Sequence, residues 1–151
     1  MLTKLERYLD QLGELQTKLI VLAGPRGSGK TELLQELGTK LGAQPLNVNL
    51  ELGRRLSATP HTARGFSAGQ LLREIADKQR KEDVLLLDNI ELLFERGLEI
   101  NPLDLIKRLA HSKRVVAVWP GDLRGNRLYY AEMTHPEYRD YAADGVVALE
   151  I

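Results

Sequence analysis

The stretch GPRGSGKTELLQEL, residues 24–37, decides the fold of this chain. From Gly24 to Thr31 it satisfies the pattern G-x-x-x-x-G-K-[ST], a phosphate loop whose backbone amides converge on phosphate oxygens at a helix N-terminus. Glycine permits the positive φ angles of such a turn, Lys30 brings a positive charge to the outer phosphates, and the Thr31 hydroxyl can bind Mg²⁺. The motif predicts a site for ATP and Mg²⁺, with contacts from Gly24, Pro25, Arg26, Gly27, Ser28, Gly29, Lys30, Thr31 and Glu32.

The residues on either side of the phosphate loop supply the strand and the helix that this motif requires. LIVLA, residues 19–23, has the continuous apolar run of a strand that is buried on both faces. Leucines then recur on one side of a helix that Gly42 can end. The alternative is a glycine-rich turn beside a surface lysine, and the flanking strand and helix argue against it.

Strand and helix patterns alternate along the rest of the chain, which is typical of a parallel sheet covered by helices. Capping-box spacing of Ser67 and Gln70 predicts one helix start, and Asn101 before Pro102 predicts another. Residues 53–65 have no period and are expected to form a loop. The expected strands are 19–23, 45–50, 84–88, 115–119 and 146–151, and the expected helices include 2–16, 67–81, 101–112 and a short one opening at Thr134 with Glu137.

Composition places the chain among single globular domains. It has 151 residues, 43% of them apolar, and 21 basic residues balance 21 acidic ones. There is no cysteine, so disulfides and thiolate metal sites are excluded. No apolar run is long enough to span a membrane or form a signal peptide, so we expect a cytoplasmic protein. We expect one domain over residues 1–151, with an N-terminal helix in 1–18 and the core in 19–151.

A second nucleotide motif is VLLLD, residues 84–88, an apolar strand that ends in an acidic residue. Asp88 is the candidate magnesium carboxylate that accompanies Lys30. Asp88 follows Lys30 by 58 positions, which leaves room for a helix, a strand and a helix. This order resembles AAA+ and RecA-like ATPases, in which a strand lies between the two motif strands, and not nucleoside kinases. The resemblance implies a three-layer α/β P-loop NTPase fold with a five-stranded, mostly parallel sheet, here without a C-terminal helical lid.

The residue after Asp88 departs from those families, where a glutamate often polarises the attacking water. Asn89 takes that place, and a neutral amide can orient water but accepts its proton poorly. Glu91 is the nearest substitute, and its side chain can face the site or the solvent. Lys30, Asp88, Asn89 and Glu91 are therefore the candidate catalytic residues of this region.

The expected fourth strand leads into AVWPGDLRGNR, residues 117–127, which carries two further candidate catalytic residues. Arg124 and Arg127 can contact phosphate within the chain or serve as an arginine finger for a neighbouring subunit. The alternative is a solvated loop. Without a lid the nucleotide would be partly uncovered, so we expect weak binding or slow turnover until a neighbour completes the site.

Several longer blocks resemble BrxF, the small P-loop protein family of type 3 BREX phage-defence loci. The resemblance implies an ATPase that works with a methyltransferase, a PglZ-type protein, a BrxC-type ATPase and a helicase. It also implies that residues 24–31 and Asp88 bind ATP and Mg²⁺ and that Asn89 is a family feature. The blocks are NVNLELGRRL (47–56), LLLDNIELLF (85–94), VAVWPG (116–121) and HPEYRDY (135–141).

Direct DNA contact is an open point in the sequence. Arg54, Arg55 and Arg64 lie in the expected 53–65 loop, where they can meet DNA phosphates or dock a partner protein. The chain has no basic stripe, which favours the partner. The three histidines stand far apart in the sequence, so we expect no metal cluster.

Three functions follow from these features. The first is an ATPase that is slow alone and faster when it assembles with itself, with partners or with DNA. The second is a non-hydrolysing ATP-dependent switch that docks partners, an alternative that Asn89 keeps open. The third, a small-molecule kinase, is disfavoured by the strand order.

Overall fold

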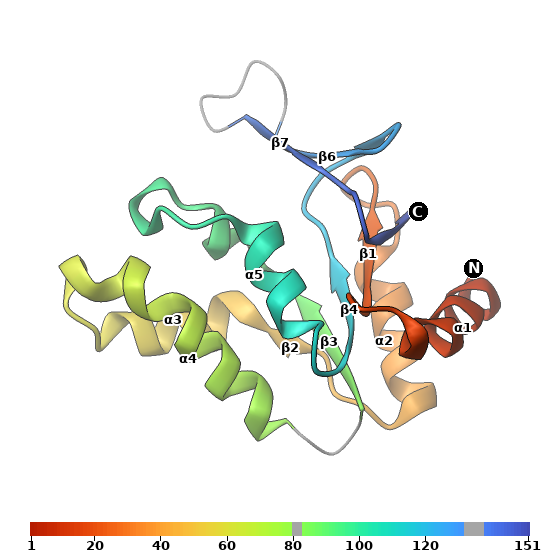
Figure 1. The fold of residues 1–151 in the computed structure, drawn as a ribbon, viewed down its shortest axis with the longest axis horizontal. Helices are drawn as coiled ribbons and strands as arrows, with labels where there is room; N and C mark the ends of the chain where they lie inside the picture. The colour runs from red at the N-terminus through yellow and green to blue at the C-terminus, as the bar shows by residue number, and fades with distance from the viewer. Residues whose placement is uncertain (80–82, 132–137) are drawn as a thin grey trace.

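The computed structural model describes residues 1–79, 83–131 and 138–151 and contains a five-stranded sheet. All neighbouring strands in it are parallel. The phosphate-loop strand β1 and the Asp88 strand β3 are separated by β4, which confirms the strand between the two motif strands (Figure 1). Across the sheet the order is β2 (Leu46–Asn47), β3 (Val84–Asp88), β4 (Arg114–Val118), β1 (Leu19–Ala23) and β8 (Val147–Glu150).

Helices cover both faces of this sheet and give the expected three layers (Figure 1). Successive residues of β1 face opposite sides, so Ile20 and Leu22 pack with one helix layer, while Val21 packs with the other. One layer consists of α1 (Leu2–Gln11) and α2 (Lys30–Leu41), and the other consists of α3 (Val48–Ser57), α4 (Arg64–Lys78) and α5 (Pro102–Leu109).

Two expected helix ends are confirmed. Gly42 ends α2 in the left-handed conformation, with φ of 71°, and its N–H donates to the Gly38 carbonyl. Asn101 caps α5, because its side chain accepts a hydrogen bond from the Asp104 N–H, and Pro102 is the first helical residue.

The expected strand over residues 45–50 is wrong beyond Asn47. Asn47 ends β2 and caps α3, with its side chain accepting from the Leu50 N–H. The alternation of Leu46, Val48 and Leu50 suggested a strand, but Val48 is buried at helical spacing with later leucines while Leu50 is 48% exposed. The helical period therefore decides the local structure here.

The expected loop over residues 53–65 is also wrong. The helix α3 continues to Ser57, and α4 begins at Arg64 after a single 3₁₀ turn, η2 (His61–Ala63). Ser67 consequently lies inside α4 and does not cap it. The N-terminal helix ends earlier than expected and continues into the 3₁₀ turn η1 (Leu12–Glu14).

A second, antiparallel sheet lies above the carboxyl ends of the parallel strands (Figure 1). It pairs β5 with β6 and β6 with β7, and no sequence pattern predicted it. The expected helix at Thr134 and Glu137 lies outside the described residues. None of the helices within the described ranges is long and apolar enough to cross a membrane. The strands are β5 (Leu123–Arg124), β6 (Arg127–Tyr130) and β7 (Arg139–Ala142), and the turns η3 (Glu91–Phe94) and η4 (Arg96–Leu98) precede α5.

Candidate nucleotide-binding site

The phosphate loop forms the turn from β1 to α2. Gly24, Gly27 and Gly29 have φ of 149°, 81° and 98°, values that favour glycine. A Cβ on Gly24 would lie 2.6 Å from the carbonyl oxygen of Ile151, so space as well as conformation requires glycine there. The loop therefore presents its backbone at the N-terminus of α2, as the motif predicts.

Lys30 connects the phosphate loop to the tip of β4. Its ammonium donates hydrogen bonds to the carbonyl oxygens of Gly24, at 2.6 Å, and Trp119, at 2.8 Å. Burial lowers the pKa of Lys30, while the carboxylates of Asp122, Glu91 and Asp88 act in the opposite direction. The charge of Lys30 is thus held among three carboxylates at the carboxyl ends of the strands.

Asp88 and Asn89 form a tight turn at the end of β3. Asp88 is buried, with 8% of its surface exposed, and its Oδ1 accepts from the Asn89 N–H at 2.8 Å. Asn89 adopts a positive φ of 52°, which asparagine tolerates better than most residues. Its carbonyl accepts from the Asn49 N–H at 2.8 Å, so the turn is attached to the start of α3.

Asn49 also binds Glu91, which opens η3. The Asn49 Nδ2 donates to Glu91 Oε2 at 3.0 Å, and Asn49 Oδ1 accepts from the Leu92 N–H at 2.8 Å. Glu91 is exposed, yet its carboxylate is close enough to Lys30 to favour the charged lysine. The candidate base therefore lies beside the site and is held there by a neutral amide.

The residues present fit ATP and Mg²⁺. Ser28 Oγ is buried and has no hydrogen-bond partner among the described residues, as expected for a hydroxyl in a loop that receives phosphate oxygens. Thr31 lies in the first turn of α2 and Asp88 ends β3, and hydroxyl and carboxylate oxygens are ligands that Mg²⁺ prefers. Thr31 and Asp88 are the residues that would hold the ion.

The two candidate arginines lie on the second sheet. Arg124 Nη2 is 3.6 Å from Asp122 Oδ2, and its guanidinium lies 4.9 Å from the ring centre of Tyr129. Arg127 binds one oxygen of Asp140 through Nε at 3.1 Å and Nη2 at 2.6 Å, which raises the pKa of Arg127. Of these two arginines, Arg124 is the one that lies near Lys30, because its partner Asp122 is one of the carboxylates that act on Lys30.

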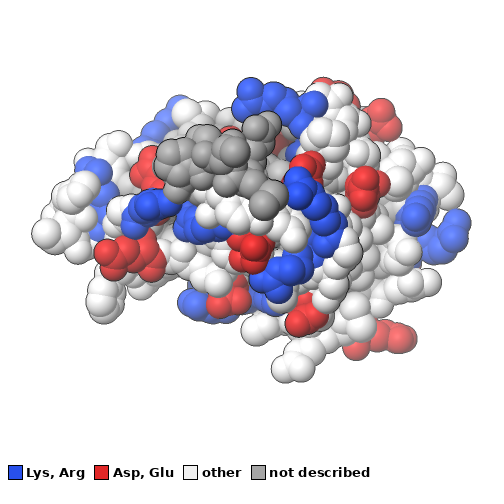
Figure 2. Space-filling model, turned by 90° about the horizontal axis from the view of Figure 1, so that it is seen from above, with Lys and Arg blue, Asp and Glu red and all other residues white. Residues whose placement is uncertain are grey.

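The arginines proposed for DNA contact do not share a loop. Arg54 and Arg55 lie on α3 and Arg64 opens α4. Arg54 pairs with Glu51 at 3.6 Å, and Arg55 pairs with Glu74 at 3.2 Å. Seen from above, several Lys and Arg side chains lie next to one another near the middle of the face, with Asp and Glu side chains beside them (Figure 2).

Sequence reasoning missed three contributors to this site: Asn49, Asp122 and the carbonyl of Trp119. The expected strand over residues 45–50 places Asn49 on its polar side, whereas the asparagine cap at Asn47 is a sequence signal for a helix that contains Asn49. Asp122 follows the expected fourth strand closely, as acidic site residues often do. A backbone carbonyl has no sequence signature.

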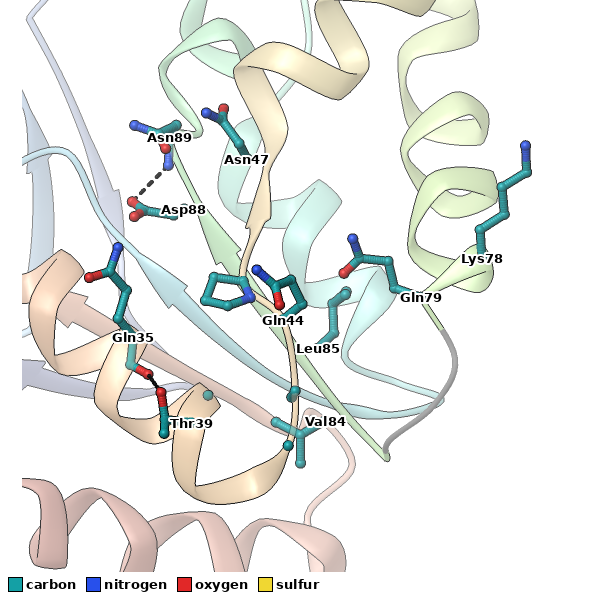
Figure 3. A pocket seen from close by; sticks show the side chains of 14 residues that line it. Gln35, Thr39, Gln44, Asn47, Lys78, Gln79, Val84, Leu85, Asp88 and Asn89 are labelled. Atoms are coloured by element: carbon teal, nitrogen blue, oxygen red, sulfur yellow. Dashed lines mark hydrogen bonds between the residues drawn. The ribbon is translucent and has the colours of Figure 1, made fainter.

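A cavity of about 970 Å³ borders the tip of β3. Asp88 and Asn89 lie at one end and Val84 at the other, with α2 on one side and the end of α4 opposite (Figure 3). Most polar residues between these ends are uncharged. They are Gln35, Thr39, Gln44, Asn47 and Gln79.

The fold and the site define a P-loop nucleotide-binding protein whose sheet places a strand between its two motif strands. The chain belongs to the AAA domain family, whose pattern it matches over residues 16–118. It is thus an ATP-binding domain of the AAA type. A search of curated proteins finds no match.

Several solved structures are similar to this chain, and one of them shares its fold. A DNA replication initiation factor aligns with a TM-score of 0.53 and 20% identity, over 99% of this chain and 44% of that one. PCH-2 of C. elegans aligns with a TM-score of 0.48 and 16% identity, over 99% of this chain and 42% of that one. DnaA of Aquifex aeolicus with bound AMPPCP aligns with a TM-score of 0.46 and 22% identity, over 99% of this chain and 44% of that one. The chain spans less than half the length of these structures.

Proposed function

We propose that this chain is a slow, Mg²⁺-dependent ATPase that self-assembly or partners stimulate. The observation that carries the proposal is the position of Lys30, whose ammonium lies between the phosphate loop and the tip of β4, within the field of Asp88 and Glu91. A charge-bearing phosphate loop beside the carboxylate of Asp88 at the end of β3 and that of Glu91 at the start of η3 supports phosphate binding and water activation in one place.

Each residue has a distinct task in this proposal. The phosphate-loop amides and Lys30 bind and orient the triphosphate, and Asp88 with Thr31 holds the metal. Bound Mg²⁺ would neutralise phosphate charge. Glu91 accepts a proton from the attacking water, a task that the Asn89 amide cannot perform.

Three contacts within the chain support slow turnover when it is alone. Glu91 is engaged by Asn49 Nδ2, so the base has a competing partner. Arg127 is engaged by Asp140, and Arg124 is near Asp122, so both arginines are paired within the chain. We infer that a second copy or a partner completes the site, which makes a homo-oligomer part of the proposal.

The biological setting is proposed from the resemblance to BrxF. We infer that the chain is a component of a BREX-type phage-defence complex with a methyltransferase, a PglZ-type protein, a BrxC-type ATPase and a helicase. Co-purification of the tagged chain with these four proteins tests this setting, and a chain that binds none of them contradicts it. Direct DNA contact through Arg54, Arg55 and Arg64 is tested by DNA affinity against salt, which falls steeply if phosphates are bound.

The alternative function is a non-hydrolysing switch whose bound ATP docks partners, and Asn89 supports it. Phosphate release, measured across a series of protein concentrations with and without partners, separates the two. Rates that rise more than linearly with concentration indicate sites completed between subunits. No phosphate release under any of these conditions contradicts the ATPase and leaves the switch. The third function, a small-molecule kinase, remains disfavoured by the strand order.

A further inference from the structure

The turn η3, which carries Glu91, depends on tertiary contacts for its orientation. It is a single 3₁₀ turn of four residues, and such turns have few internal hydrogen bonds to fix them. At its start, Asn49 accepts from the Leu92 N–H and donates to Glu91. A second contact, from the antiparallel sheet, holds its other end.

That second contact is made by Arg139, the first residue of β7. Its Nη2 donates a hydrogen bond to the carbonyl oxygen of Phe94, the last residue of η3. Its guanidinium also lies 5.7 Å from the ring centre of Phe94 and 5.9 Å from that of Tyr130. Arg139 thus binds both the backbone and the side chain at the end of the turn.

Aromatic packing adds to this attachment. The Phe94 ring stacks on Tyr130 of β6, with ring centres 4.0 Å apart and planes 14° apart. Trp119 meets Phe94 edge to face at 5.1 Å, and its indole N–H donates to the Tyr129 carbonyl at 2.9 Å. One cluster therefore connects the turn η3, which carries Glu91, with the second sheet and with Trp119, whose carbonyl accepts a hydrogen bond from Lys30. The cluster consists of Phe94, Trp119, Tyr130 and Arg139.

We propose that Arg139 is a positioning residue for Glu91, acting through its hydrogen bond to the Phe94 carbonyl at the far end of η3. The inference rests on the proposed ATPase function and on the role of Glu91 within it. Arg139 touches neither Lys30 nor the phosphate loop in any described contact, so its loss affects the proton acceptor and spares nucleotide binding. A misplaced catalytic group lowers kcat without a matching change in affinity.

The test is a double-mutant cycle of Arg139→Gln, Glu91→Gln and the two together. We measure kcat and KM for MgATP, the affinity for a non-hydrolysable ATP analogue with Mg²⁺ by calorimetry, and thermal unfolding. Arg139→Gln is expected to lower kcat roughly tenfold with the analogue affinity unchanged. In the double variant the loss is expected to equal that of Glu91→Gln alone, since the two residues act as one unit.

Two further variants complete the design. Arg73→Gln on α4 removes the same charge from an exposed position and is the control, with kcat unchanged. Arg139→Lys keeps the charge and a donor but loses the planar fork, so part of kcat is restored. If Arg139→Gln does not fold, Arg139→Lys takes its place in the cycle, with a smaller loss of kcat that vanishes in the Glu91→Gln background.

The outcomes separate the inference from the function it rests on. If Glu91→Gln retains wild-type turnover, the role of Glu91 is wrong and the inference falls with it. If Glu91→Gln loses turnover while the Arg139 variants keep theirs, only the inference is wrong. Losses that multiply in the double variant, or a loss confined to KM, also overturn the positioning role.

Discussion

Lys30 and Trp119 are joined by a hydrogen bond of 2.8 Å from the ammonium to the carbonyl oxygen. The same ammonium binds the Gly24 carbonyl, so Lys30 joins the residues that follow the neighbouring strands β1 and β4 at the phosphate loop. When Lys30 turns toward the phosphates of a nucleotide, we expect it to exchange this carbonyl for a phosphate oxygen. Trp119 is the chain's single tryptophan, so its emission reports the exchange.

Lys30→Ala is expected to abolish turnover, because ATP loses a charged partner in a half-buried site. The affinity for MgATP should fall roughly a hundredfold. Trp119 emission should change when MgATP is added to the wild type and stay constant for the variant. Lys40→Ala, which removes an exposed lysine of the same helix, is the control. Wild-type affinity in Lys30→Ala would contradict the site.

Glu91→Gln is expected to lower turnover roughly a hundredfold while MgATP affinity is unchanged, because only the proton acceptor is lost. Phosphate release gives the rate, and calorimetry gives the affinity. Turnover that survives the change would show that another group activates the water.

Asn49→Asp is expected to raise basal turnover severalfold. The new carboxylate can still accept from the Leu92 N–H, so η3 stays attached, but it repels Glu91 where the amide bound it. The proton acceptor is then free for the attacking water. Steady-state phosphate release checks this, and a rate as low as that of Glu91→Gln would show that Asn49 positions Glu91 and does not restrain it.

Gly121→Ala is expected to reduce the free energy of unfolding by about 2–4 kcal/mol. A Cβ there would lie 1.8 Å from the Tyr129 carbonyl oxygen, so the link between β4 and the second sheet must shift. Gly97→Ala is the control, because no described residue other than its chain neighbours has a heavy atom within 4 Å of the added Cβ. Urea unfolding measures both, and equal stability of the two variants would contradict the close packing.

The sequence predicted the fold where one local signal was decisive. The phosphate loop, its strand and its helix follow from a motif whose residues are adjacent in the chain. The strand ending in Asp88 follows from a continuous apolar run. Their relative order in the sheet followed from the number of elements between them, and the structure confirms it.

The remaining features depend on contacts that sequence patterns do not encode. Residues 46–50 fit both a strand period and a helix period, and the burial of Val48 with the later leucines decides for the helix. The second sheet consists of strands of two to four residues, too short to show a period. The bond from Asn49 to Glu91 joins residues 42 positions apart.

The position of β4 determines how far apart the two motif strands lie. Since neighbouring strands lie about 4.8 Å apart, the strand between β1 and β3 sets their separation at roughly 10 Å. The strand that enters the phosphate loop and the strand that ends in Asp88 are therefore spaced by the width of a strand whose own side chains take no part in the proposed chemistry. Substitutions within β4 can change the dimensions of the nucleotide site without touching any residue that binds the nucleotide.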